Sequence, residues 1–149
     1  MSHSPLDSAR MQLIHQLVYF DEERFHILDN YFANERTKKI GEQFVEDYTR
    51  TLESIIANFE EESLHSVALI GSRVQTLDEG FEDSYTIVFP HQADPDRNQI
   101  SFLAPFGFQL LLASQDESRT IETPIGSSNV QVRQVKYVNM GEPYDKPRL

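Results

Sequence analysis

With 149 residues, no cysteine and a formal net charge of −11, the chain has the size of one globular domain with a helical extension. The lack of cysteine excludes disulfides, a thiolate nucleophile and cysteine-ligated zinc, and the acidity disfavours a free-standing nucleic-acid binder, because phosphate contacts need clustered Lys and Arg. No apolar run is long enough to span a membrane and the first residues do not resemble a signal peptide, so a cytoplasmic protein is expected.

The first part of the chain, up to about residue 63, predicts two long helices. Apolar residues recur at three- and four-residue steps over 13–32 and, more regularly, over 40–59. Ser4-Pro5 is typical of a helix start. The apolar pattern lapses over 33–39, which predicts the tip of an antiparallel helical hairpin formed by residues 1–64. The expected tip residues are Asn34, Glu35, Arg36 and Thr37.

The acidic run Asp21-Glu22-Glu23 interrupts the apolar stripe of the first helix and leaves two alternatives open. A break at this run would give three helices instead of two. A turn at residues 20–24 would instead place a pair of carboxylates at the apex of a hairpin with very unequal arms.

After Glu60-Glu61-Glu62, which is expected to close the second helix, the pattern changes to that of strands. One short helix from about Phe106 to Ala113 interrupts them, and Pro105 presets its first turn. The fold class is therefore α+β, with a small antiparallel sheet curled over one short helix in residues 65–139 and a flexible tail at 140–149. The expected strands are 67–70, 85–89, 100–103, 120–122 and 130–138, the last with a bulge between Val132 and Val135.

No catalytic, cofactor or metal site is predicted. The five histidines lack the spacing of metal ligands, and the glycines stand singly at turns and form no phosphate-binding loop. The acidic runs place carboxylates on adjacent helical positions, where they diverge into solvent. Phe106 and Phe108 cannot both point inward from one short helix, so one of them is expected on the surface as a partner-facing anchor.

Over residues 71–138 the chain resembles the C-terminal domain of the Gre transcript-cleavage factors, which has an FK506-binding-protein-like fold. The resemblance rests on short motifs in the same order, namely Gly71-Ser72-Arg73-Val74, Tyr85-Thr86-Ile87-Val88, Ala93-Asp94, Ile100-Ser101, Ala104-Pro105-Phe106-Gly107, Leu110-Leu111 and Thr123-Pro124-x-Gly126. In the family, this domain docks on the rim of the RNA polymerase secondary channel. The resemblance implies that the docking surface here consists of Asp94, Ala104, Pro105, Phe106 and Phe108. The chain departs from the family in having Ala104 in place of a serine and in lacking the glycines that usually follow the helix.

In Gre factors the hairpin reaches down the channel, and two acidic residues at its tip help to hold a catalytic magnesium ion. The predicted tip segment, residues 33–39, has one carboxylate among three cations, and the hairpin is shorter. Both features resemble the short-hairpin, Rnk-type relatives. The resemblance implies a non-enzymatic regulator of transcription elongation that binds bacterial core RNA polymerase, stimulates no cleavage, and binds neither a specific DNA sequence nor a membrane. The alternatives are a peptide-binding or prolyl-isomerase-like module, with Tyr85 and Phe102 lining a cleft, and a self-associating scaffold.

Overall fold

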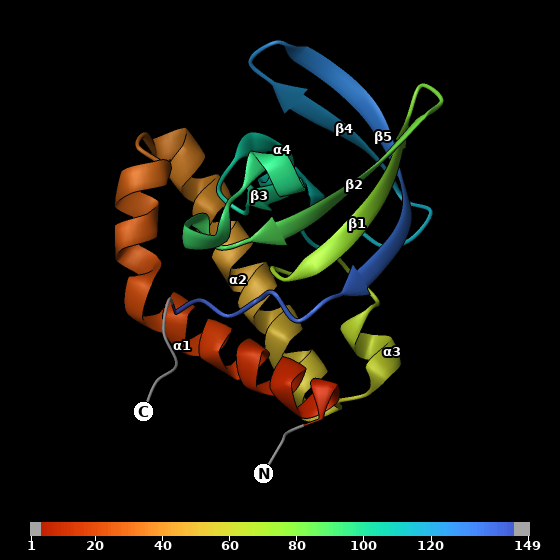
Figure 1. Ribbon diagram of the computed structural model, residues 1–149. Coiled ribbons are helices and arrows are strands. Elements are labelled where there is room, and N and C mark those ends of the chain that lie inside the picture. Colours follow the sequence, from red (N-terminus) through yellow and green to blue (C-terminus); the bar gives the residue numbers. More distant parts are fainter. Residues whose placement is uncertain (1–3, 145–149) are drawn as a thin grey trace.

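A hairpin of two long helices lies beside a curled five-stranded sheet in this computed structural model, which describes residues 4–144 (Figure 1). Helix α1 runs from Pro5 to Tyr31 and helix α2 from Glu35 to Ala57. The predicted helix start is confirmed, because the Ser4 side chain accepts a hydrogen bond from the Asp7 backbone N–H at 3.1 Å.

Helix α1 is continuous through Asp21-Glu22-Glu23, so both alternatives based on this acidic run are wrong. Asp21 and Glu22 are exposed and Glu23 is half-buried, so none of the three carboxylates has to be buried for the helix to continue. The acidic run therefore lies in the second half of α1 and not at the apex of the hairpin.

The hairpin turns at residues 32–34, where Asn34 caps α2. The Asn34 side chain accepts from the Thr37 backbone N–H at 2.9 Å, and the Thr37 hydroxyl accepts from the Asn34 backbone N–H at 3.3 Å. The four expected tip residues thus lie at the turn, but Glu35, Arg36 and Thr37 already belong to α2. The apolar pattern lapses there because the start of α2 is largely exposed, not because the helix has ended.

Two predictions for the next segment are wrong. Helix α2 ends at Ala57, and the acidic residues that were expected to close it form a separate turn, α3 (Glu61–Leu64). Residues 67–70 are a buried loop and not a strand, although Ala68 exchanges backbone hydrogen bonds with the chain after α4: its N–H donates to Ala113 and its C=O accepts from Leu112. The apolar run reflects burial without sheet pairing.

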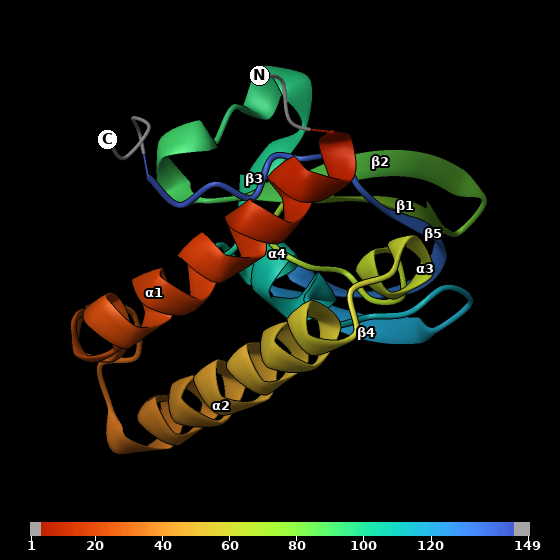
Figure 2. The same cartoon turned by 90° about the horizontal axis from the view of Figure 1, so that it is seen from below.

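The sheet has the strand order β3-β2-β1-β5-β4 and wraps around the short helix α4 (Pro105–Leu110), as the view from below shows (Figure 2). The predicted α+β class is confirmed, and so is the bulge at Arg133, where the pairing of β1 with β5 shifts. One pair differs from the expected antiparallel sheet, because β3 runs parallel to β2. The connection between them contains two short 3-10 turns, η1 (Pro90–Gln92) and η2 (Pro95–Arg97), which return the chain to the same end of the sheet. The strands are β1 Ser72–Asp78, β2 Phe81–Val88, β3 Gln99–Ser101, β4 Ser118–Thr123 and β5 Gly126–Tyr137.

The hairpin and the sheet share one hydrophobic core. Phe20 of α1 lies at their junction, with ring centroids 5.4 Å from Tyr48 of α2 and 5.9 Å from Phe102, which follows β3. Phe89 also contacts Phe102, at 5.4 Å, and all four of these residues are at most 1% exposed. The hairpin expected at 1–64 and the sheet region expected at 65–139 therefore bury apolar surface against each other.

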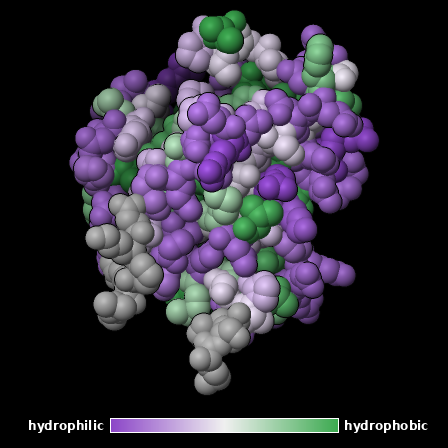
Figure 3. Space-filling model, in the orientation of Figure 1, coloured by the Kyte–Doolittle hydropathy of each residue, from purple (hydrophilic) through white to green (hydrophobic). Residues whose placement is uncertain are grey.

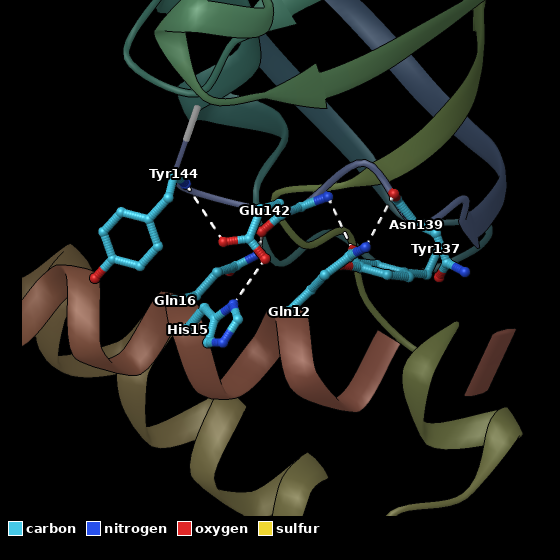
Figure 4. A network of polar contacts seen from close by, with 8 residues as sticks. Gln12, His15, Gln16, Tyr137, Asn139, Glu142 and Tyr144 are labelled. Atoms are coloured by element: carbon cyan, nitrogen blue, oxygen red, sulfur yellow. Dashed lines mark hydrogen bonds and ion pairs between the residues drawn. The ribbon is translucent and has the colours of Figure 1, made fainter. Parts of the chain in front are cut away.

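The chain after β5 crosses α1 and is held there (Figure 4). Gln12 donates to the Asn139 carbonyl at 3.1 Å and accepts from the Gly141 N–H at 3.2 Å, and His15 Nδ1 lies 2.7 Å from Glu142 Oε2. Gly141 and Glu142, in the tail that was expected to be flexible, are thus tied to the hairpin. The last five residues of that tail, 145–149, lie outside the described residues.

Gln16 joins four segments of the chain at this crossing and has no exposed surface. Its amide nitrogen donates to the carbonyls of Ile70 and Gly141, both at 2.8 Å. Its amide oxygen accepts from the Tyr48 hydroxyl at 2.6 Å, and that hydroxyl accepts in turn from the Ile70 N–H at 2.8 Å. Every polar group of this buried set has a partner, which is the condition for a buried polar network to stabilise a fold.

The stability of the protein is expected to decrease when the pH falls below about 6.5. His65 Nδ1 accepts a hydrogen bond from the Tyr137 backbone N–H at 2.8 Å, which requires that nitrogen to be unprotonated. Burial lowers the pKa of His65 from its ordinary value of 6.5, with Lys136 adding to this effect and Glu61 opposing it. The folded protein therefore binds fewer protons than the unfolded chain, and the stabilisation is full above pH 6.5 and lost as the pH falls toward the folded pKa.

Urea unfolding across pH 5 to 8 measures this contribution. A His65→Gln variant can accept the same hydrogen bond without titrating, and its profile should be flatter than that of the wild type. Identical slopes for the two proteins would contradict the assignment to His65.

Candidate functional site

Helix α4 begins with an exposed proline on the surface that the Gre resemblance implicates. Pro105 is the first helical residue, and the preceding Ala104 N–H donates to the Ser101 carbonyl at 3.0 Å. Gly107 is buried, and a Cβ atom at this position would collide with the Ser101 carbonyl oxygen. The glycine therefore allows α4 to sit directly on β3, which fixes where Pro105 meets the solvent.

Phe106 and Phe108 are both half-buried, whereas one of them was expected on the surface. The Phe106 ring packs on Tyr85 of β2, with centroids 4.8 Å apart. On the other side of α4, the Phe108 ring packs on Phe44 of α2 at 4.8 Å and on Phe32 at 5.5 Å. Because the sheet covers one side of α4 and the hairpin the other, a six-residue helix can bury part of both rings.

A chain of polar contacts connects the Phe106 side of α4 to Asp94. Tyr85 donates to Asp83 at 2.9 Å, and Asp83 accepts from the Asn98 side chain at 3.2 Å. Asn98 has a left-handed backbone conformation with φ 52° and closes the η2 turn, which Asp94 caps by accepting from the Asp96 N–H at 3.1 Å. Burial, with the adjacent Asp83 carboxylate, raises the pKa of Tyr85 to about 12, so the hydroxyl remains a donor at neutral pH.

Arg119 of β4 holds the end of α4 and was not identified from the sequence. Its guanidinium donates to the carbonyls of Gln109 and Leu111, both at 2.8 Å, and pairs with Glu117. Burial of Glu117 opposes ionisation, but the hydrogen bonds from Arg119 and Ser114 outweigh this effect, and the pKa of Glu117 is lowered. Arg119 thus satisfies carbonyls that a short helix leaves without partners.

The hairpin turn lies next to α4. Phe32, which ends α1, contacts Phe108, so the expected tip residues and the expected docking helix are neighbours. Of the cations near the turn, Lys38 pairs with Asp29 at 3.0 Å. Glu35 is the one carboxylate among the expected tip residues, beside Arg36.

Among residues 4–144, no group of three or more His, Cys, Asp or Glu side chains is placed to hold a metal ion. Within the same range no helix is both long and apolar enough to cross a membrane. The surface is mostly hydrophilic in the view of Figure 3, with scattered apolar residues. Ile125, in the β4–β5 turn, is 99% exposed.

Residues 63–137, or 75 of the 149, match the family model described as "Transcription elongation factor, GreA/GreB, C-term". The chain belongs to this family. It is 32% identical over 103 residues to transcription elongation factor GreA of Listeria welshimeri, covering 65% of this chain and 64% of the relative. To GreA of Bacillus subtilis it is 36% identical over 99 residues, covering 63% of each. The GreA/GreB family resemblance noted in the sequence is therefore confirmed, and the chain spans about 64% of the length of these relatives.

Among solved structures, Gfh1 of Thermus thermophilus, a GreA factor homolog, is 24% identical, with a TM-score of 0.42 over 85% of this chain and 93% of that one. A GreA/GreB elongation factor of Nitrosomonas europaea is 28% identical, with a TM-score of 0.45 over 69% of this chain and 93% of that one.

Proposed function

We propose that this Gre-family protein binds bacterial core RNA polymerase in the cytoplasm and regulates transcription elongation without stimulating transcript cleavage. The family assignment of residues 63–137 carries this proposal. The binding surface is the start of α4 at Ala104 and Pro105, the exposed parts of Phe106 and Phe108, and the Asp94 turn.

The hairpin supports the proposed absence of cleavage stimulation. The Gre resemblance implies that cleavage needs two carboxylates at the tip, because magnesium is a hard cation that prefers oxygen ligands. Here the turn offers Glu35 beside Arg36 and Lys39, which does not fit such a site. The turn also packs on α4 through Phe32 and Phe108. We assign the protein to the short-hairpin, Rnk-type members, which would act by occupying the channel entrance or by competing with other Gre factors.

The peptide-binding alternative lacks its cleft. It required Phe102 and Tyr85 to line a pocket, but Phe102 has no exposed surface and Tyr85 lies against Phe106. Phe102 belongs to the hydrophobic core, where it cannot line a binding cleft.

A Pro105→Glu variant is expected to bind core RNA polymerase at least about tenfold more weakly than the wild type, because it puts a charge into an apolar contact. Glutamate is tolerated at an exposed first helical position, so α4 should stay folded. The matched control is Ile125→Glu, which adds the same charge at an exposed apolar residue on the β4–β5 turn. Biolayer interferometry with immobilised polymerase measures both affinities.

Competition with a cleavage-competent Gre factor locates the binding site. Loss of binding on adding that factor supports the secondary channel. If both variants bind like the wild type, the α4 surface is the wrong one, and if the wild type does not bind, the functional proposal fails. Adding the protein to a backtracked elongation complex should release no short transcript.

A further inference from the structure

Two cations lie side by side on the outer face of the sheet, which is the face turned away from α4, and a third lines the adjoining pocket. Arg73 of β1 is directly opposite Lys136 of β5 and Thr86 of β2. Their neighbours Val74 and Val135 are buried on the inner face, so Arg73 and Lys136 point outward. The third cation, Arg97 of η2, lines the same shallow pocket as Arg73.

A cluster of three cations is unusual in a protein with so few basic residues in this part of the chain. The net charge is −11, and residues 65–144 contain only five Arg or Lys, of which these are three. Like charges directly opposite each other on neighbouring strands destabilise a sheet. Among the described residues neither Arg73 nor Lys136 has an ion pair, and the Arg97 guanidinium lies 3.6 Å from the Asp94 carboxylate.

The pocket also contains a hydroxyl that lacks a partner. It has a volume of about 390 Å³. Thr86 is 6% exposed, and within residues 4–144 its hydroxyl makes no hydrogen bond. Because its oxygen remains accessible to solvent, this hydroxyl can bind a ligand in the pocket. The residues that line the pocket are Arg73, Ser84, Thr86, Asp96, Arg97 and Asn98.

We propose that this pocket binds the diphosphate group of a small phosphorylated ligand, either free pyrophosphate or the diphosphate of a nucleotide. Guanidinium groups bind phosphoryl oxygens through paired N–H donors, and the Thr86 and Ser84 hydroxyls can donate to the same oxygens. Arg73 and Arg97 both line the pocket, so each can bind one of two linked phosphoryl groups, and Lys136, directly opposite Arg73, adds positive charge beside it. The acidic remainder of the surface repels a longer polyanion, which favours a small ligand over a nucleic-acid strand.

Isothermal titration of the full chain with pyrophosphate tests the proposal, and ADP and inorganic phosphate serve as further probes. Pyrophosphate should bind more tightly than phosphate, and Arg73→Gln should weaken it about tenfold through the loss of charge-assisted hydrogen bonds. Thr86→Val, which keeps the shape of the side chain, should weaken binding a few-fold. Asp96→Asn should strengthen it, because Asp96 is the one carboxylate that lines the pocket among the described residues. Tighter binding of ADP than of pyrophosphate would identify a nucleotide as the source.

The matched control is Arg133→Gln, which removes the same charge from β5 outside this pocket. Equal losses for Arg73→Gln and Arg133→Gln would show a general charge effect and overturn the site, as would the absence of any heat with pyrophosphate. Tighter binding of a short RNA than of pyrophosphate would also overturn it, in favour of a nucleic-acid surface. Thermal unfolding verifies the fold. The melting temperature of Arg73→Gln should be no lower than that of the wild type, because the substitution removes the charge repulsion between residue 73 and Lys136. None of these outcomes depends on binding to polymerase.

Discussion

Replacing Gln16 with leucine is expected to lower the free energy of unfolding by about 3 kcal/mol, although leucine is the more apolar residue. The substitution roughly keeps the volume of the side chain but leaves the buried carbonyls of Ile70 and Gly141 each without one donor. It also removes the acceptor of the Tyr48 hydroxyl. Urea denaturation followed by circular dichroism measures the change.

The control for this prediction is Gln43→Leu, an exposed glutamine on α2 whose replacement should change stability by less than about 0.5 kcal/mol. Combining Gln16→Leu with Tyr48→Phe should cost less than the sum of the two single changes, because both remove members of one network. Strict additivity would show that the two side chains stabilise the fold independently, contrary to the hydrogen bonds described.

Truncating Phe20 to alanine is expected to lower the free energy of unfolding by about 4 kcal/mol, within the range measured for large aromatic residues in cores. Phe20 has no exposed surface and contacts Tyr48 of the hairpin and Phe102 of the sheet region. The hairpin and the sheet should still unfold in a single transition, because they share this core. Far-ultraviolet circular dichroism follows the helices, and the fluorescence of a dye on a cysteine introduced at Ser128 follows the sheet.

Phe25→Ala on the same helix is the matched control, since Phe25 is 75% exposed and its loss should cost little. Two separate transitions in either variant would mean that the helices and the sheet region are independent folding units. That result would support a boundary near residue 64 and contradict the single core.

Local sequence signals correctly predicted the elements whose backbone conformation depends on neighbouring residues. The three- and four-residue periodicity placed both long helices, and the Ser4-Pro5 and Pro105 signals placed the starts of α1 and α4. The slip in alternation between Val132 and Val135 predicted the bulge at Arg133. In each case the residues concerned determine the backbone conformation at their own position.

The predictions that failed depended on distant parts of the chain. Residues 67–70 look like a strand because they are apolar, but they are buried in the loop that leads to β1. The parallel direction of β3 depends on how η1 and η2 turn the chain. The partial burial of both Phe106 and Phe108 requires the hairpin and the sheet to flank α4, which no local pattern encodes.

The candidate sites likewise combine signals that are local in the sequence with contacts between distant parts of the chain. The motif around Pro105 was visible in the sequence, but the contacts from Tyr85 through Asp83 to Asn98 join β2 to the η2 turn. Arg73 and Lys136 are 63 positions apart, and only the register of β1 with β5 places them opposite each other. Arg73 lies outside every strand that was expected from the sequence, so its position opposite Lys136 could not be anticipated without that register.

The position of the turn against α4 determines how the length of the hairpin can change between homologues. Helix α1 is about 40 Å long. It packs on the sheet region through Phe20, and Phe32 at its end packs on α4. A hairpin that projects freely can gain or lose heptads at its turn without disturbing the rest of the molecule. In this chain a deletion near the turn would remove one wall of α4, whereas an insertion beyond Phe32 would leave the core unchanged and extend a new arm past the docking helix. Lengthening is therefore structurally tolerated and shortening is not, so the present hairpin is close to the minimum that this arrangement of the sheet and α4 permits.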